Sequence, residues 1–337
     1  MKVLHLGFGG QMIVQCEALK EIGVDATSCH FNQGKFKFQP DICLHLNQLS
    51  KEERLQRRRE LLAAAAKEYD IFHFHFGKTF LPDHSDLAYL KKLGKKMVVQ
   101  HRGSDVRRLS IARDQYKNPY VKIKKKFKNE KKVVAVLKKM SSYIDHAIVA
   151  DHELLPYVKD FYKHVHIIHQ AIPLDDFEPK YPSVSNHTPL IVHAPSHYTV
   201  KGSEFVINAI KRLYKNGYTF RCELASKLPH DQLKELYKEA DIIIDQLRIG
   251  SFGVASLEGM ALGKPVICYI RNDLTNTYPQ ELPILNASPK SIYKVLKKII
   301  VNPDQRYKLG VKGRQYAEMH HDLQQIASQL AILYEKL

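Results

Sequence analysis

The sequence predicts an α/β protein made of two Rossmann-like domains with parallel sheets. Short apolar runs of strand length alternate with stretches of helical periodicity along most of the chain. Its 337 residues are too many for one compact core and enough for two domains of ordinary size. A hydrophobic content of 44% with 26% charged residues is typical of a globular protein.

The clearest strand-turn-helix-strand unit lies in the second half of the chain. Residues 242–244 are three isoleucines, which predict a buried strand, and a glycine-containing turn follows at residues 250–253. Apolar residues then recur at helical spacing up to Gly263, and residues 266–268 predict the next strand. Such a turn points backbone N–H groups and a helix N-terminus at an anion, for example a nucleotide phosphate. Glu258 lies two turns further along this helix.

The segment SFGVASLEGMALGKPVI, residues 251–267, resembles a donor-site motif. It is similar to the retaining GT-B glycosyltransferases of group 1, the family-4 class, whose pattern is Glu-x-Phe-Gly-x-x-x-x-Glu-x-Met-Ala-x-Gly-x-Pro-Val. By this resemblance Glu258 holds the ribose hydroxyls of the donor nucleotide. The turn residues that resemble the rest of the donor site are Gly250, Ser251, Phe252 and Gly253. Gly250 stands where the family has its first glutamate, so recognition of the donor sugar stays open.

The resemblance covers nearly the whole chain and implies a domain plan. Two Rossmann-like domains would face a cleft, and the last helix would cross back to the N-terminal domain. We expect an acceptor-side domain over residues 1–172, a proline-rich linker over 173–189 and a donor domain over 190–318. Residues 319–337 would be the returning helix.

Lys201 matches the family's lysine that grips the donor diphosphate, and it follows a predicted strand at residues 190–196. A lysine and a helix N-terminus stabilise the charge that grows on a leaving diphosphate, so they could replace a metal ion. We therefore expect no metal and no cofactor. The family's usual arginine five residues earlier is Ser196 here, and His197 beside it is assigned to donor binding.

In the first half, a glycine turn at residues 7–10 follows the first predicted strand. Its spacing is not that of a dinucleotide fingerprint, so an NAD site is weakly supported. The resemblance instead implies that Gly9 and Gly10 let the donor approach the backbone.

A second polar cluster follows the predicted strand at residues 96–100, at the strand end where open α/β sheets bind ligands. By resemblance His101 is catalytic, touching the donor sugar or the acceptor hydroxyl, and Arg102 and Asp105 lie on the acceptor side. Asp105 could equally be a helix cap. The stretch VQHRGSDVRRLSIA and the nearby NPYVK also resemble a Bacillus-type subgroup that acts on envelope or spore-coat glycans.

His73 and His75 alternate with phenylalanines on a predicted strand. Two positions on one strand supply only two metal ligands, and the spacing shows no third. Histidines with structural hydrogen bonds are therefore favoured over a metal site.

Positive charge is concentrated in residues 91–139, which hold 18 Lys and Arg against three acidic residues. This field favours an anionic partner, either an anionic membrane surface or an acidic polymer acceptor. Nucleic acid is disfavoured because zinc spacing, RNP-like sequence and a helix-turn-helix signature are missing. A solvated lysine-rich face without a partner stays an alternative.

The sequence predicts a cytoplasmic protein, bound peripherally at the inner face of the membrane. It has no apolar run of about 18 residues, and its first residues do not resemble a signal peptide. The five cysteines are odd in number and widely spaced, which favours reduced thiols.

The function that this resemblance implies is transfer of a sugar from a nucleotide-diphosphate donor to an envelope or surface glycan, or to a lipid-linked acceptor, with retention. A catalytically silent GT-B protein that binds a nucleotide or glycan is the rival. A nucleotide-sugar epimerase of the same fold is a further alternative.

Overall fold

The computed structural model describes residues 1–34, 37–226, 228–279 and 282–337. They form two compact units. Unit 1 comprises Met1–Ile111, Lys125–Ala171 and Leu323–Leu337, and unit 2 comprises Ala112–Lys124 and Ile172–Asp322. Neither unit is therefore one continuous stretch of chain.

The described part of unit 1 contains a seven-stranded sheet in the order β3-β2-β1-β4-β5-β6-β7, and neighbouring strands are parallel. Its strands are β1 (Lys2–Gly7), β2 (Asp25–His30), β3 (Ile42–Cys43), β4 (Ile71–His75), β5 (Lys96–Gln100), β6 (His146–Val149) and β7 (His164–Ile167). Its helices are α1 (Gly10–Glu21), α2 (Lys51–Glu68), α3 (Asp86–Lys92), α4 (Glu130–Ser141), α5 (Leu155–Val158) and α12 (Leu323–Glu335).

The described part of unit 2 contains a five-stranded parallel sheet in the order β12-β11-β10-β8-β9. Its strands are β8 (Leu190–His193), β9 (Arg221–Leu224), β10 (Ile242–Ile244), β11 (Val266–Cys268) and β12 (Ile284–Asn286). Its helices are α6 (Tyr198–Lys201), α7 (Ser203–Lys215), α8 (His230–Glu239), α9 (Val254–Ala261), α10 (Ile292–Ile300) and α11 (Pro303–His320).

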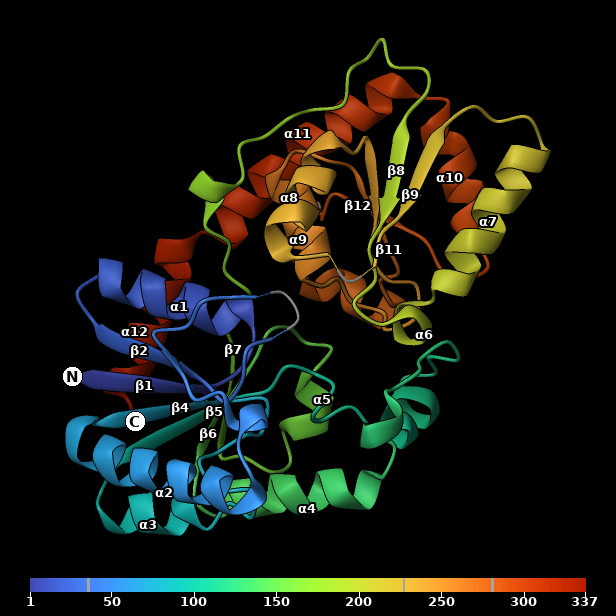
Figure 1. Ribbon diagram of the computed structural model, residues 1–337. Helices are drawn as coiled ribbons and strands as arrows, with labels where there is room; N and C mark the ends of the chain where they lie inside the picture. The colour runs from blue at the N-terminus through green and yellow to red at the C-terminus, as the bar shows by residue number, and fades with distance from the viewer. Residues whose placement is uncertain (35–36, 227, 280–281) are drawn as a thin grey trace. The chain divides into compact units, whose positions relative to one another are not determined.

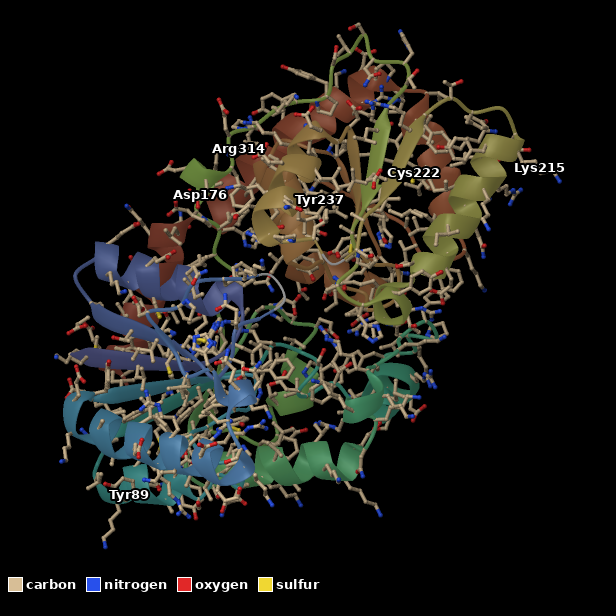
Figure 2. The ribbon with its side chains drawn as sticks, viewed as in Figure 1. Tyr89, Asp176, Lys215, Cys222, Tyr237 and Arg314 are labelled. Carbon is tan, nitrogen blue, oxygen red and sulfur yellow. The ribbon has the colours of Figure 1, made fainter. Side chains whose placement is uncertain are left out.

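Helices cover both faces of each sheet (Figure 1). In unit 2, α7 and α10 pack on one face and α8, α9 and α11 on the other. Tyr237 of α8 is only 1% exposed inside this layer, whereas Lys215 at the end of α7 points into solvent (Figure 2). The predicted α/β class is confirmed. Within the described ranges, none of the helices combines the length and apolar character that crossing a membrane requires.

Long-range contacts place one segment differently from the expected plan. We expected all of residues 1–172 in the N-terminal domain, but residues 112–124 group with unit 2. The reason is the buried side chain of Asn118, whose amide donates to the backbone carbonyls of Arg248 and Ile249, both at 2.9 Å. The chain spacing alone could not show this contact, because the partners are about 130 residues apart.

Strand order determines where loops converge. In unit 1 the order reverses between β1 and β4, and in unit 2 it reverses between β8 and β10. Loops after the two central strands then leave in opposite directions, which opens a crevice at the carboxyl ends of the strands. The residues after β8 and β10 are therefore the first place to look for a site.

The last helix completes the core of unit 1. Helix α12 packs on α1, and its apolar face is buried together with residues of β1, β4 and β5. Ile326, Leu330 and Leu333 of α12 are at most 3% exposed in this cluster. The predicted return of the last helix to the first domain is confirmed.

Beside this apolar cluster lies a chain of buried polar side chains from β1, β4 and α12. The Tyr334 hydroxyl is 2.7 Å from Nδ1 of His73 and 2.9 Å from Nε2 of His5. Nδ1 of His5 is 3.0 Å from Nε2 of His75, and Nδ1 of His75 is 2.9 Å from Nη2 of Arg102. His5, which the sequence did not single out, is thus the third histidine beside His73 and His75.

Arg102 sets the direction of this hydrogen-bond chain, because a guanidinium only donates. His75 then accepts at Nδ1 and donates from Nε2 to His5, His5 donates to Tyr334, and Tyr334 donates to His73. The ligand atoms of the three histidines lie within 4.8 Å of one another. However, a metal at His75 needs Nε2 without its proton and a proton on Nδ1, facing the guanidinium. The geometry therefore favours a hydrogen-bond chain over a metal site.

This chain makes stability depend on pH. Burial, reinforced by Arg102 and opposed by Asp41, lowers the pKa of His5 to about 3. Burial also lowers the pKa of His73 and of His75 well below the usual value. Because the folded pKa lies below the unfolded value of about 6.5, the stabilisation is complete above that pH and is lost as the pH falls.

We expect the free energy of unfolding, measured by urea denaturation, to fall between pH 7.5 and pH 5. The slope below about pH 6.5 should approach roughly 1.4 kcal/mol per pH unit for each buried neutral histidine. A variant with His187→Gln, an exposed histidine outside this hydrogen-bond chain, serves as the control and should keep the slope. Constant stability across this range would contradict the expectation.

Candidate functional site

Lys201 and the residues after β10 meet at the strand-order reversal of unit 2. Lys201 ends α6, which follows β8, and its Nζ donates to Oδ1 of Asp245 at 2.7 Å. Asp245 follows β10 directly and its side chain is only 1% exposed. The Lys201 side chain is 16% exposed, whereas its counterion is almost completely buried.

Asp245 also holds the start of α9. Its Oδ2 accepts from the backbone N–H of Gly253 at 2.9 Å and from the Ser256 hydroxyl at 2.8 Å. Burial raises the pKa of Asp245, but the charge of Lys201 and these hydrogen bonds outweigh it, so the pKa is lowered overall. The sequence did not identify Asp245. Its position as the first charged residue after the isoleucine run could have marked it as a candidate.

Helix α9 forms as predicted, from Val254 to Ala261, and it buries Glu258. Oε1 of Glu258 is 2.7 Å from Nε2 of His230, the first residue of α8. This bond, opposed by burial, raises the pKa of His230. The site thus contains a second hydrogen-bonded pair, Glu258 with His230. His230 was not predicted because it lies far from the motif in sequence.

The turn at Gly250 explains why a glutamate is missing there. Gly250 has a φ of 96°, a conformation that side chains rarely adopt. A Cβ would lie 2.8 Å from Cδ of Arg271 and closer still to its Cγ. Arg271 is held by two hydrogen bonds of 2.9 and 2.8 Å to Asp273, and its guanidinium lies over the Tyr116 ring. The Arg271 side chain thus occupies the space that a residue at 250 would need.

The remaining unit 2 residues assigned to donor binding lie at the start of α6 and in the segment after Gly250. His197 is half-buried and accepts at Nδ1 from the N–H of Val200, 3.4 Å away, at the start of α6. The Ser251 carbonyl accepts from the Gln246 side chain. The ring of Phe252 lies 5.3 Å from the ring of Tyr278.

The assigned residues of unit 1 lie at the carboxyl ends of its own strands. Gly9 precedes α1 with a φ of 106° and has open space around it. A Cβ on Gly10 would clash with the ring of Phe38, whose nearest atom would lie 2.6 Å away. These two glycines follow β1, which is one of the two strands at the reversal of strand order.

His101 is buried, with both ring nitrogens engaged. Nδ1 is 2.8 Å from Oδ2 of Asp105, and Nε2 is 3.0 Å from the Tyr162 hydroxyl. Oδ1 of Asp105 accepts from the backbone N–H of Arg102 at 3.0 Å. Asp105 thus accepts a backbone N–H, as a helix cap would. However, its other oxygen bonds to His101, so it orients a histidine and does not cap a helix. Burial, opposed by Asp105, lowers the pKa of Arg102 to about 10.

Comparisons with known proteins find a family match in the same part of the chain. The model of the family described as "Glycosyl transferases group 1" matches residues 197–316. No curated protein sequence matches the chain. Lys201, Asp245 and Glu258 all lie inside the matched region.

Solved structures resemble the whole chain. Sucrose-phosphate synthase from Thermosynechococcus elongatus is 16% identical with a TM-score of 0.69, covering 100% of this chain and 99% of its own. HepE of Anabaena, in complex with UDP and glucose, is 13% identical with a TM-score of 0.70 and full coverage of both chains. The catalytic domain of starch synthase IV from Arabidopsis thaliana, bound to ADP and acarbose, is 12% identical with a TM-score of 0.63, covering 100% and 99%.

The resemblance to group 1 glycosyltransferases is thus confirmed where the family model matches. The chain has the GT-B fold, and its residues 197–316 match the model of the family described as "Glycosyl transferases group 1".

Proposed function

We propose that this protein is a glycosyltransferase that moves a sugar from a nucleoside-diphosphate donor to a glycan or lipid-linked acceptor, with retention and without a metal ion. One observation carries the proposal. The region that matches the family contains Lys201, Asp245 and Glu258, which lie on the segments after β8 and β10. The neighbours crystallised with UDP or ADP make these nucleotides the first to test.

In this proposal Lys201 stabilises the departing diphosphate. The leaving group is an anion, so a fixed cation lowers the energy of the transition state. An ammonium carries three N–H groups, so its bond to Asp245 is compatible with further bonds to diphosphate oxygens. Asp245 keeps Lys201 in place.

Glu258 is assigned to the ribose hydroxyls. A carboxylate offers about four acceptor sites, so the bond from His230 leaves room for hydroxyl donors. On the acceptor side we assign His101, which Asp105 orients through Nδ1. Its Nε2 would exchange the Tyr162 hydroxyl for a substrate hydroxyl. Asp105 then acts by orienting His101, and Arg102 acts by donating its backbone N–H to Asp105.

A catalytically silent nucleotide-binding protein is the second candidate, and the turn at Gly250 favours it. The family's first glutamate is absent, and Arg271 fills its space. A backbone group or Ser251 must therefore take over contacts to the sugar, or turnover is lost while the nucleotide still binds.

We expect Lys201→Ala and Glu258→Gln each to weaken UDP or ADP binding by about 1–3 kcal/mol, the cost of losing a hydrogen bond to a charged group. Isothermal titration calorimetry measures this directly. Lys215→Ala in α7 and Glu235→Gln in α8 are exposed controls in the same unit and should bind like wild type. Equal affinity in all four variants would remove the site assignment.

The enzyme and the silent protein differ in turnover. We expect wild type to release nucleoside diphosphate from at least one nucleotide sugar, and the rate to be unchanged by EDTA. His101→Ala should lower kcat by roughly 100-fold, within the range for losing a positioned proton-transfer group, while UDP affinity stays the same. Nucleotide binding without release from any donor, even with cell extract as acceptor, would establish the silent protein instead.

We further propose that the basic region docks the protein on an anionic membrane surface. Helix α4 buries Val133, Leu137 and Met140 on one face. Its other face exposes lysines 131, 132, 138 and 139. This arrangement leaves the charge free for phospholipid headgroups.

Cosedimentation with vesicles containing phosphatidylserine should show binding at low salt. Release is expected as the Debye length shrinks from about 10 Å at 0.1 M to about 3 Å at 1 M salt. Replacing the four α4 lysines with Gln should abolish binding, whereas replacing Lys211, Lys215, Lys297 and Lys298 of α7 and α10 should not. Equal binding to neutral vesicles would count against membrane docking. Tighter binding to RNA than to the vesicles would identify nucleic acid as the partner instead.

A further inference from the structure

Residues 112–124, here called the strap, belong to unit 2 although both flanking stretches belong to unit 1. Asn118 anchors the strap and is only 1% exposed. Its side-chain amide donates to the backbone carbonyls of Arg248 and Ile249, both at 2.9 Å. Its Oδ1 accepts from the N–H of Tyr120 at 3.1 Å. Both ends of this side chain are thus used.

Asn118 holds the turn formed by residues 247–250, which is bonded to the backbone of Lys201 at one end and contains Gly250 at the other. The N–H of Leu247 donates to the backbone carbonyl of Lys201 at 2.9 Å. Arg248 donates to the Tyr120 carbonyl of the strap at 2.8 Å and pairs with Glu204 at the start of α7. Any displacement of this turn therefore reaches the backbone of Lys201.

The strap also contacts the other side of Gly250. Gly250 and Ile270 form an isolated parallel bridge, and the N–H of Arg271 donates to the Gly250 carbonyl at 2.9 Å. The Arg271 guanidinium lies 4.8 Å from the centre of the Tyr116 ring. The rings of Tyr120 and Tyr269 meet edge to face at 5.5 Å. Strap residues thus contact both chain segments of the bridge.

A turn around Gly250 needs outside support. Glycine has no side chain with which to fix the turn, and its backbone is the most flexible of any residue. The carbonyls of Arg248 and Ile249 lie on buried residues and accept from one and the same amide. Removing that amide leaves two buried acceptors without this donor, which is costly unless the turn moves to satisfy them.

We propose that Asn118 is a positioning residue of the donor site: through the carbonyls of residues 248 and 249 it holds the turn 247–250, and thereby Lys201, in the geometry that binds the donor diphosphate. This inference rests on the proposed function. In this role the strap supports a turn that has no side chain of its own at position 250.

The test compares Asn118→Ala with Asn118→Asp. Aspartate keeps the size of asparagine and the acceptor for Tyr120 but replaces the donating amide with a carboxylate facing two carbonyls. Asn129→Ala is the matched control, because Asn129 caps α4 in unit 1 and accepts from Lys132 at 3.1 Å. The measurements are hydrogen exchange of residues 245–253 without nucleotide and UDP affinity by calorimetry, below the unfolding temperature of each variant.

Both Asn118 variants should show faster exchange in residues 245–253 and about tenfold or greater loss of UDP affinity, the scale for losing one or two buried hydrogen bonds. Affinity of Asn118→Asp should partly recover as the pH is lowered, because a protonated carboxyl donates again. Asn118→Ala and Asn129→Ala should show no such recovery, and Asn129→Ala should bind like wild type.

The outcomes separate the two proposals. Unchanged exchange, or wild-type UDP affinity, in both Asn118 variants overturns the role of Asn118 and leaves the proposed function standing. A wild-type protein that binds neither UDP, ADP nor GDP overturns the proposed function and this role together.

Discussion

The carboxylate of Asp245 ties together the segments that form the candidate site. It binds Lys201 after β8 through one oxygen, and Gly253 and Ser256 at the start of α9 through the other. A buried ion pair compensates for desolvation only when its remaining acceptor sites are also used, and here three donors share one carboxylate. Losing Asp245 would leave a lysine without its counterion and a helix start without its partner. The site therefore depends on a residue outside the family motif quoted above.

Local features could be predicted from the sequence, and contacts between distant segments could not. Strand β10 and helix α9 follow from an apolar run, a glycine turn and helical periodicity, all of which are local signals. Lys201 and Glu258 could be singled out as candidates because their motifs are continuous in the sequence. His230, Asp245 and His5 were missed because each acquires its partner from another strand or helix, through a sheet order that periodicity does not encode.

Gly250 shows that a missing motif residue has structural consequences beyond its own side chain. Arg271 occupies the adjoining space, and Asp273 and Tyr116 hold Arg271 there. Restoring a glutamate at 250 would meet both an unfavourable backbone angle and an occupied volume. A carboxylate at position 250 would therefore require Arg271 to move as well.

The position of α12 has a consequence for how the protein is made. This helix follows the other described helices and strands along the chain, yet Ile326, Leu330 and Tyr334 are buried in the core of unit 1. Unit 2, whose last residue is Asp322, has its whole sequence available earlier. The strands of unit 1 thus keep an apolar face uncovered until Leu323–Glu335 has been synthesised. During that interval the nascent chain exposes the surface that chaperones recognise and that favours aggregation.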